Sequence, residues 1–165
     1  MLSKAQRVEV AKDVLKVLRM RSKGYVITPG EYLDISGNGD NISLAGKEIQ
    51  QLLNTGAIKL NNCEVCARGA CVISKARLWN NVVITNFSRE TAMYESVKMF
   101  GKKLCGMIEL AFEGEDVSEE TEKLAASVAE KCISFATSTE RVINPRKVLK
   151  RIMQNIVDNG GDFKP

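Results

Sequence analysis

The sequence predicts a mostly α, single globular domain over residues 1–165, with six or seven helices and at most a small β element. Three observations lead to this prediction. A chain of 165 residues is long enough to bury a sizeable core in one domain. Its 44% hydrophobic and 27% charged residues are ordinary for a globular protein. Apolar residues also recur mainly at helical spacing rather than at alternate positions.

The first helix is expected over residues 3–22. Its apolar positions repeat every three or four residues, at Val8, Ala11, Leu15 and Leu18. A stretch rich in glycine and proline follows and predicts a loop, with a short strand over 25–28.

Two further helices are expected in the first half of the chain. Ser43 is a suitable cap for a helix that runs to about Asn54, with Gly56 as its stop. The next helix covers 63–78, and residues 82–85 form a short strand or an extended link.

The second half begins with two helices separated by a glycine. Ser88 is expected to cap the first, Gly101 interrupts it, and the second covers 102–113. The acidic stretch that follows predicts a helix start capped by Asp116 or Ser118, because the helix dipole favours negative charge in the first turn.

That acidic helix is expected to continue to about Ala136. The last helix begins with Asn144 as its cap and Pro145 at its first position, which is a strong start signal. It runs to about Asp158, where two glycines end it.

The absence of histidine narrows the possible chemistry. The chain contains no histidine at all. Nucleophilic systems that need histidine are therefore excluded, and so are metal sites ligated by it. Acid–base catalysis would depend on carboxylates, lysine, tyrosine or cysteine. No Walker-type, GxGxxG or calcium-loop pattern is present, so we predict no cofactor.

Three of the five cysteines lie close together in "NNCEVCARGACVISKARLWNN", residues 61–81. On a single helix Cys71 would lie about 12 Å along the axis from Cys63, so the three thiols could not converge on one metal ion. A packed helix that uses cysteine as a small apolar residue is the favoured interpretation, with no metal. A zinc site and a CxxC redox centre remain the alternatives.

Three segments of the sequence carry a resemblance to a known group of proteins. The segments are "CEVCARGA", "IELAFEG" and the terminal "RIMQNIVDNGGDFKP". They resemble a family of uncharacterised small proteins of bacteriophages and bacterial mobile elements, with a CxVCAxGA motif and an Asn-Gly-x-Phe-x-Pro tail. The resemblance covers Cys63 to Pro165. It implies a phage-type origin and a cytoplasmic setting in a bacterial host, and it implies no activity.

Charge is segregated along the chain although the net charge is only +4. Residues 1–24 carry seven Lys or Arg against two acids, and residues 141–151 carry five and no acid, whereas residues 109–130 carry eight acids and one Lys. On the first helix, four basic residues fall within an arc of roughly 60°. They are Lys12, Lys16, Arg19 and Lys23.

A second basic cluster occupies the first two turns of the last helix. Its members are Arg146, Lys147, Lys150 and Arg151. Cations are unfavourable at a helix N-terminus unless they pair with acids or hold an anion. The eight residues of the two clusters are therefore the candidate anion-binding residues. The acidic stretch 113–122 is the alternative partner for the second cluster, and a solvated face is the alternative for the first.

These observations favour a non-enzymatic, phage-type accessory protein that binds or sequesters an anionic partner. The partner would be a nucleotide signal, a nucleic acid or an acidic protein surface, and counteracting host defence is one role that fits the implied origin. The alternatives are a structural or interaction protein that acts as a homo-oligomer, and a small enzyme without histidine. No apolar run reaches the ~18–20 residues that a membrane span needs, so no membrane partner is expected.

Overall fold

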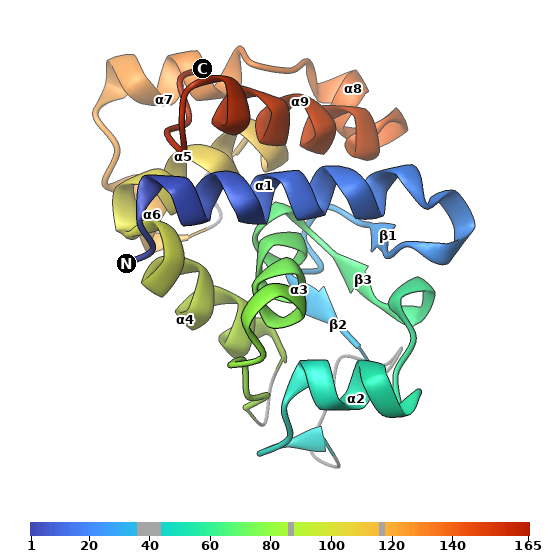
Figure 1. Cartoon of the computed structure of the whole chain (residues 1–165). Coiled ribbons are helices and arrows are strands. Elements are labelled where there is room, and N and C mark those ends of the chain that lie inside the picture. Colours follow the sequence, from blue (N-terminus) through green and yellow to red (C-terminus); the bar gives the residue numbers. More distant parts are fainter. Residues whose placement is uncertain (36–43, 86–87, 116–117) are drawn as a thin grey trace.

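The computed structural model describes residues 1–35, 44–85, 88–115 and 118–165, and these residues form a mostly helical domain (Figure 1). The helices are α1 (Lys4–Arg19), α2 (Ile49–Thr55), α3 (Ala67–Trp79), α4 (Ser88–Phe100), α5 (Lys102–Glu113), α6 (Glu119–Glu122), α7 (Ala126–Ile133), α8 (Ser138–Ile143) and α9 (Pro145–Asp158). The strands are β1 (Val26–Ile27), β2 (Leu33–Asp34) and β3 (Glu64–Val65), and two short 3-10 turns are η1 (Arg21–Lys23) and η3 (Leu60–Asn62). The predicted fold class is confirmed.

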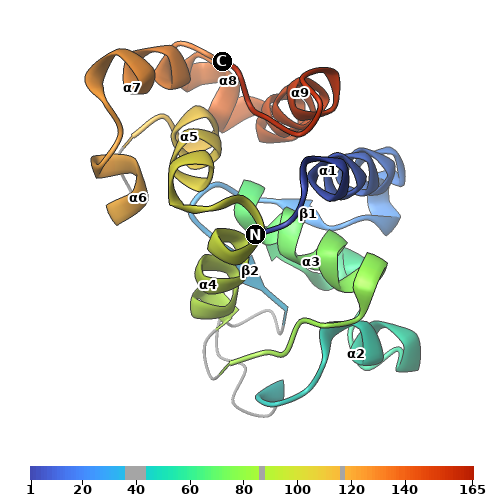
Figure 2. The same ribbon diagram turned by 60° about the vertical axis from the view of Figure 1, so that its left-hand side comes forward.

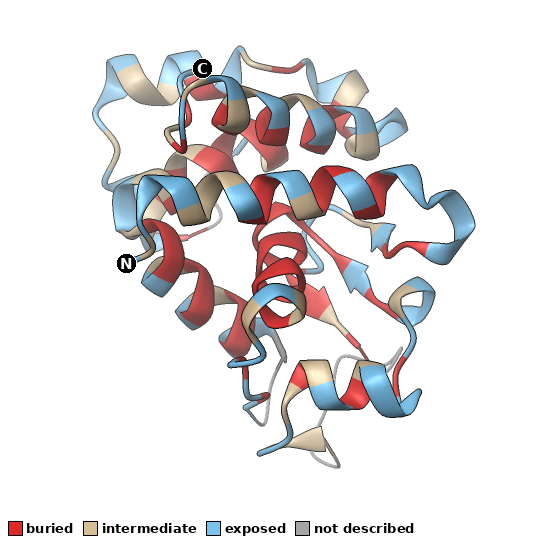
Figure 3. Cartoon of the chain, in the orientation of Figure 1, coloured by how far each residue is buried: buried red, intermediate tan, exposed pale blue. Residues whose placement is uncertain are grey.

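Helix α3 is the centre of the core. Its residues Ala67–Ala76 are all buried, and it packs against α1, α2, α4 and α5 (Figure 3). Burying a side chain such as Ile73, which is 0% exposed, contributes about 1.5–3 kcal/mol. A Cβ atom on Gly69 would lie 1.7 Å from the carbonyl oxygen of Tyr32, so only glycine lets the backbone beside β2 approach this helix.

Helices α1 and α9 lie side by side and antiparallel, as two views agree (Figures 1 and 2). At one end Lys4 forms an ion pair with Asp162, and at the other the Arg146 guanidinium donates to the carbonyl of Leu18. The C-terminal end of α1 therefore meets the N-terminal end of α9. This meeting point is where the candidate site lies.

The small sheet has the order β1-β3-β2. β3 pairs in parallel with β1, with Ile27 opposite Val65, and antiparallel with β2, with Leu33 opposite Val65. The strand expected over 25–28 is confirmed. β2 and β3 were not predicted, because strands of two residues are too short to display an alternating pattern.

The predicted helix over 63–78 begins too early. Glu64 and Val65 form the central strand of the sheet, Cys66 is the N-cap, and α3 starts at Ala67. Pairing with two strands holds this segment extended, which overrides its apparent helical pattern. The small-residue side of α3 consequently faces strand backbone at Gly69 as well as neighbouring helices.

The helix predicted to start at Ser43 and run to about Asn54 corresponds to α2. Ser43 lies outside the described residues, and α2 itself begins later, at Ile49. Gly56 ends it with a φ of 74°, as expected for a glycine C-cap.

The prediction of one helix from the acidic stretch to Ala136 is wrong. The structure divides this region into α6 and α7, because Ala125 is extended, with φ −62° and ψ 140°. Ser118 does form a capping box at the start of α6, whereas Asp116 lies outside the described residues. In the described part of the chain, no helix is long and apolar enough to cross a membrane.

Candidate anion-binding pocket

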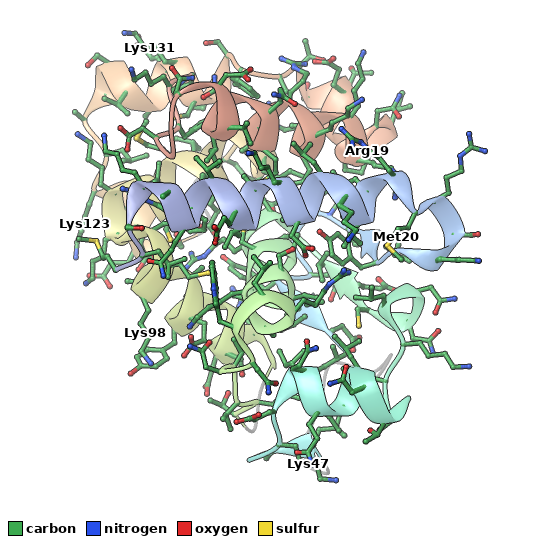
Figure 4. All side chains as sticks on the ribbon, viewed as in Figure 1. Arg19, Met20, Lys47, Lys98, Lys123 and Lys131 are labelled. Atoms are coloured by element: carbon green, nitrogen blue, oxygen red, sulfur yellow. The ribbon has the colours of Figure 1, made fainter. Side chains whose placement is uncertain are left out.

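A pocket of about 480 Å³ opens between the C-terminal end of α1 and the N-terminal end of α9. We call it the α1–α9 pocket. Eight residues line it: Leu15, Leu18, Arg19, Arg21, Asn144, Arg146, Lys147 and Lys150. It exists because α1 and α9 run antiparallel, which brings segments about 125 residues apart in sequence into contact. Figure 4 shows Arg19 at this end of α1, next to α9.

The pocket is strongly cationic. Of the described residues that line it, five are arginine or lysine and none is a carboxylate. Leu15 and Leu18, each 6% exposed, form an apolar floor. The positive end of the α9 dipole adds to this potential, although the N–H groups of Lys147 and Val148 already donate to the carbonyl of Asn144.

The five cations are held in different ways. Arg146 is half-buried and donates to the carbonyl of Leu18, one of the last carbonyls of α1. Lys147 lies 3.8 Å from the carboxylate of Glu140 and is exposed. Arg19, Arg21 and Lys150 are exposed and form no ion pair with any described residue. Most of the positive charge is therefore available to a ligand.

Arg21 adopts an unusual backbone conformation. Its φ is 52°, in the left-handed region that glycine normally occupies. This conformation disfavours an L-residue by about 1–2 kcal/mol. Arg21 directly follows the C-cap residue of α1, a position where helices commonly end in the left-handed conformation, and it lines the α1–α9 pocket.

The structure brings together four of the eight predicted site residues. Arg19 from the first cluster joins Arg146, Lys147 and Lys150 from the second in the α1–α9 pocket. Lys23 belongs to η1 rather than to the first helix and lines a different pocket.

Lys12 and Lys16 are exposed on α1 and do not line the α1–α9 pocket. Arg151 points to α8: it pairs with Glu140 at 3.1 Å, donates to the carbonyl of Phe135 and stacks over its ring. Glu140, rather than the acidic stretch 113–122, is thus the carboxylate that pairs with the second cluster.

Two pocket residues were not singled out from the sequence. Arg21 stands among the basic residues of the N-terminal segment, but its strained backbone is invisible in the sequence. Asn144 was identified only as a helix cap, and it also lines the pocket. The Thr-x-x-Glu pattern of Thr137 and Glu140 is a sequence signal that would have located α8, where both residues form a capping box.

The five cysteines are free and buried. Burial raises the pKa of the Cys63 and Cys66 thiols to about 12 each, so neither is a thiolate at neutral pH. Cys63 directly precedes β3 and does not lie in the first turn of a helix, the position where a helix N-terminus would lower the pKa of its thiol. Among the described residues, no three cysteine or carboxylate side chains gather in a way that could hold a metal ion.

A buried polar network links α3, α4 and α5. Arg68, 2% exposed, forms an ion pair with Glu109 at 2.9 Å and donates to Ser96 and to the carbonyl of Met93. Glu109 also accepts hydrogen bonds from Tyr32 and Ser118. Such a network is closed to a substrate, and its contacts are those of a structural element.

Glu113 is the carboxylate most suited to acid–base chemistry. Burial, followed by the nearby charges of Glu109 and Glu115, raises its pKa to about 7, although the N–H of Gly30 donates to both of its oxygens. Glu113 does not line the α1–α9 pocket. The group with the most suitable pKa and the cationic pocket are therefore separate features.

Comparison with known protein families, with curated protein sequences and with solved structures finds no match to this chain.

Proposed function

We propose that this protein is a non-enzymatic binding protein that holds a phosphate-bearing anion in the α1–α9 pocket. One observation carries the proposal: among the described residues, five cations and no carboxylate line a single concave site. Like charges repel one another, so a fold gathers them without acids where a ligand supplies the counter-charge.

The geometry favours a phosphate over a simple halide or carboxylate. Three of the five cations are arginines, whose planar fork binds phosphate oxygens with two parallel hydrogen bonds. The volume of about 480 Å³ falls within the range of small-molecule sites, about 300–1,000 Å³. The floor of Leu15 and Leu18 suits an uncharged portion of the same ligand.

A pair of charge-reversal variants tests the proposal. Arg19→Glu with Lys150→Glu removes two pocket cations that make no ion pair with a described residue. Lys12→Glu with Lys16→Glu is the matched control, because it makes the same charge change outside the pocket. Exposed charges contribute little to stability, so both variants should fold.

Binding of inorganic pyrophosphate is measured by titration calorimetry at 50 and 200 mM salt. We expect the wild type and the control to bind, with weaker binding at the higher salt concentration, and the pocket variant to lose binding. Equal binding by all three proteins would refute the pocket as the site, and no binding by the wild type at 50 mM would refute the function.

Self-association is a second candidate function, and a separate observation favours it. Val142 and Ile143 are 80% and 70% exposed at the end of α8, directly before the pocket residue Asn144. Adjacent exposed apolar side chains mark interaction surfaces more often than single ones do. Sedimentation analysis of the wild type and of a Val142→Ser, Ile143→Ser variant tests it: a dimer that the variant abolishes would support this role, and a monomeric wild type would refute it.

A further inference from the structure

A second cationic pocket lies on the other side of the turn that ends α1. Its volume is about 530 Å³, and it is bounded by η1, α2, η3 and the C-terminal end of α3. Residues along the turn alternate between the two sites: Arg19 and Arg21 line the α1–α9 pocket, and Met20 and Lys23 line the second one. Figure 4 shows Arg19 and Met20 on opposite sides of the end of α1. The two pockets therefore share a wall.

The second pocket combines positive charge with side-chain amides, and we call it the amide pocket. Its amides are Gln50, Asn54 and Asn61, and its cations are Lys23, Lys59 and Arg77. Among the described residues no carboxylate lines it, and Leu53, Ile58 and Leu60 supply apolar surface. The α1–α9 pocket, by contrast, has one amide, that of Asn144.

Two polar atoms of the amide-pocket residues have no hydrogen-bond partner among the residues that the structure describes. The Oε1 atom of Gln50 is buried and unpaired, whereas its Nε2 donates to Asn54 at 3.2 Å. The Nη1 atom of Arg77 is also buried and unpaired, although its Nε lies 3.4 Å from a carboxylate oxygen of Asp13. Unpaired buried groups are unfavourable by about 1–3 kcal/mol each. Both atoms are covered from solvent, so a ligand with a donor and an acceptor would pair with them once the Gln50 amide and the Arg77 guanidinium rotate toward the pocket.

We infer that the anionic ligand is a single-stranded nucleic acid that crosses the turn between the two pockets. This inference rests on the proposed function: phosphates occupy the α1–α9 pocket, and one base with its sugar enters the amide pocket, where Lys23 and Lys59 contact the phosphates on either side of that base. Asparagine and glutamine amides match the paired donors and acceptors of base edges, and lysines match phosphates. An acidic peptide is the competing ligand, because its carboxylates would satisfy the cations and its backbone N–H groups could donate to Gln50.

The concave shape favours a single strand over a duplex. Base edges and faces are free to enter a pocket only when the strand is unpaired. No aromatic residue of the described part of the chain lines either pocket, so the inference depends on no stacking on aromatic rings. Base contacts then depend on amide hydrogen bonds and leucine side chains, and most of the affinity depends on phosphates and therefore on salt.

Three ligands of equal charge distinguish a single-stranded nucleic acid from other polyanions. They are an eight-nucleotide single strand, the same strand without bases, and poly-glutamate of the same charge. We expect the single strand to bind at least about tenfold more tightly than either of the others in fluorescence anisotropy, because only it carries bases. Equal affinity for the abasic strand or for poly-glutamate would overturn the inference.

Variants of the amide pocket provide a second test of the inference. Lys23→Gln with Lys59→Gln removes two phosphate contacts, so the slope of log K against log salt should decrease in magnitude by about 1.4 for the single strand. Lys12→Gln with Lys16→Gln is the matched control and should leave the slope unchanged. Pyrophosphate binding should be unaffected in both variants, because pyrophosphate occupies only the α1–α9 pocket.

The two proposals fail in different ways. If the Lys23, Lys59 variant keeps the wild-type slope while pyrophosphate still binds, the inference is wrong and the proposed function stands. If neither pyrophosphate nor the single strand binds to the wild type, the proposed function fails, and the inference fails with it.

Discussion

Arg68→Met should destabilise the fold strongly while leaving the pocket intact. Arg68 and Glu109 have side chains that are each 1% exposed and lie 2.9 Å apart. The substitution removes the guanidinium but keeps a long apolar side chain, so little cavity forms. Glu109 then keeps only its hydrogen bonds from Tyr32 and Ser118. Breaking a buried ion pair on one side is unfavourable by about 3–5 kcal/mol.

That loss is large against a total stability of about 5–15 kcal/mol. With a urea m-value of about 2 kcal/mol per molar, the unfolding midpoint should fall by about 2 M. The assay is urea unfolding followed by circular dichroism. Lys123→Met is the control, because it breaks an exposed ion pair with Glu119 and should leave the midpoint unchanged.

The double variant Arg68→Met, Glu109→Gln tests the reason for the loss. Arg68 also forms an ion pair with Glu120 at 3.4 Å, and the double variant neutralises Glu109, the more deeply buried of the two carboxylates. It should therefore be more stable than Arg68→Met alone. A loss of less than about 1 kcal/mol in the single variant would refute the view that an uncompensated buried charge dominates. A double variant less stable than the single one would refute it as well.

Three further predictions follow from single features. Arg21→Gly should raise the free energy of unfolding by up to about 1 kcal/mol, because it relieves a positive φ, and should weaken pyrophosphate binding about tenfold; weaker stability in thermal melts or unchanged binding would contradict it. Glu113 has a folded pKa of about 7 against an ordinary value of 4.5, so the folded state binds more protons between these values and its stability should fall as pH rises from about 4.5 to 7. The Glu113→Gln variant should show a smaller difference in stability than the wild type between melts at pH 5 and pH 8. A variant that keeps the full wild-type difference would show that another group causes the pH dependence. All five buried thiols should resist iodoacetamide until the protein is unfolded, because burial raises their pKa; rapid labelling of the native protein would contradict this.

The sequence predicts long, regular elements well and short ones poorly. Helix α9 follows its Asn144 and Pro145 signals, and α5 matches its predicted bounds, because repeating apolar positions and caps are local properties. β2 and β3 depend on partners distant in the chain, and their two-residue length leaves no pattern. The extended Ala125, which divides the acidic helix, likewise has no local signal.

The candidate site shows the same difference between local sequence signals and contacts made by distant segments. Charge clustering identified Arg19 and three members of the second cluster, since charge is visible in the sequence. Their convergence depends on the antiparallel packing of α1 and α9, which no local pattern specifies. The same packing assigns Arg151 to an internal ion pair with Glu140, although in the sequence it is indistinguishable from Lys150.

The central claim is that the α1–α9 pocket binds phosphate, and mapping the site by NMR tests it most directly. The measurement is a titration of the isotope-labelled protein with pyrophosphate at 50 mM salt, following backbone amide shifts. We predict the largest changes at Arg19–Arg21 and at Arg146–Lys150, with small changes at Lys12 and Lys16. Changes of equal size at other exposed lysines, such as Lys102 and Lys103, or no changes at all, would contradict the claim.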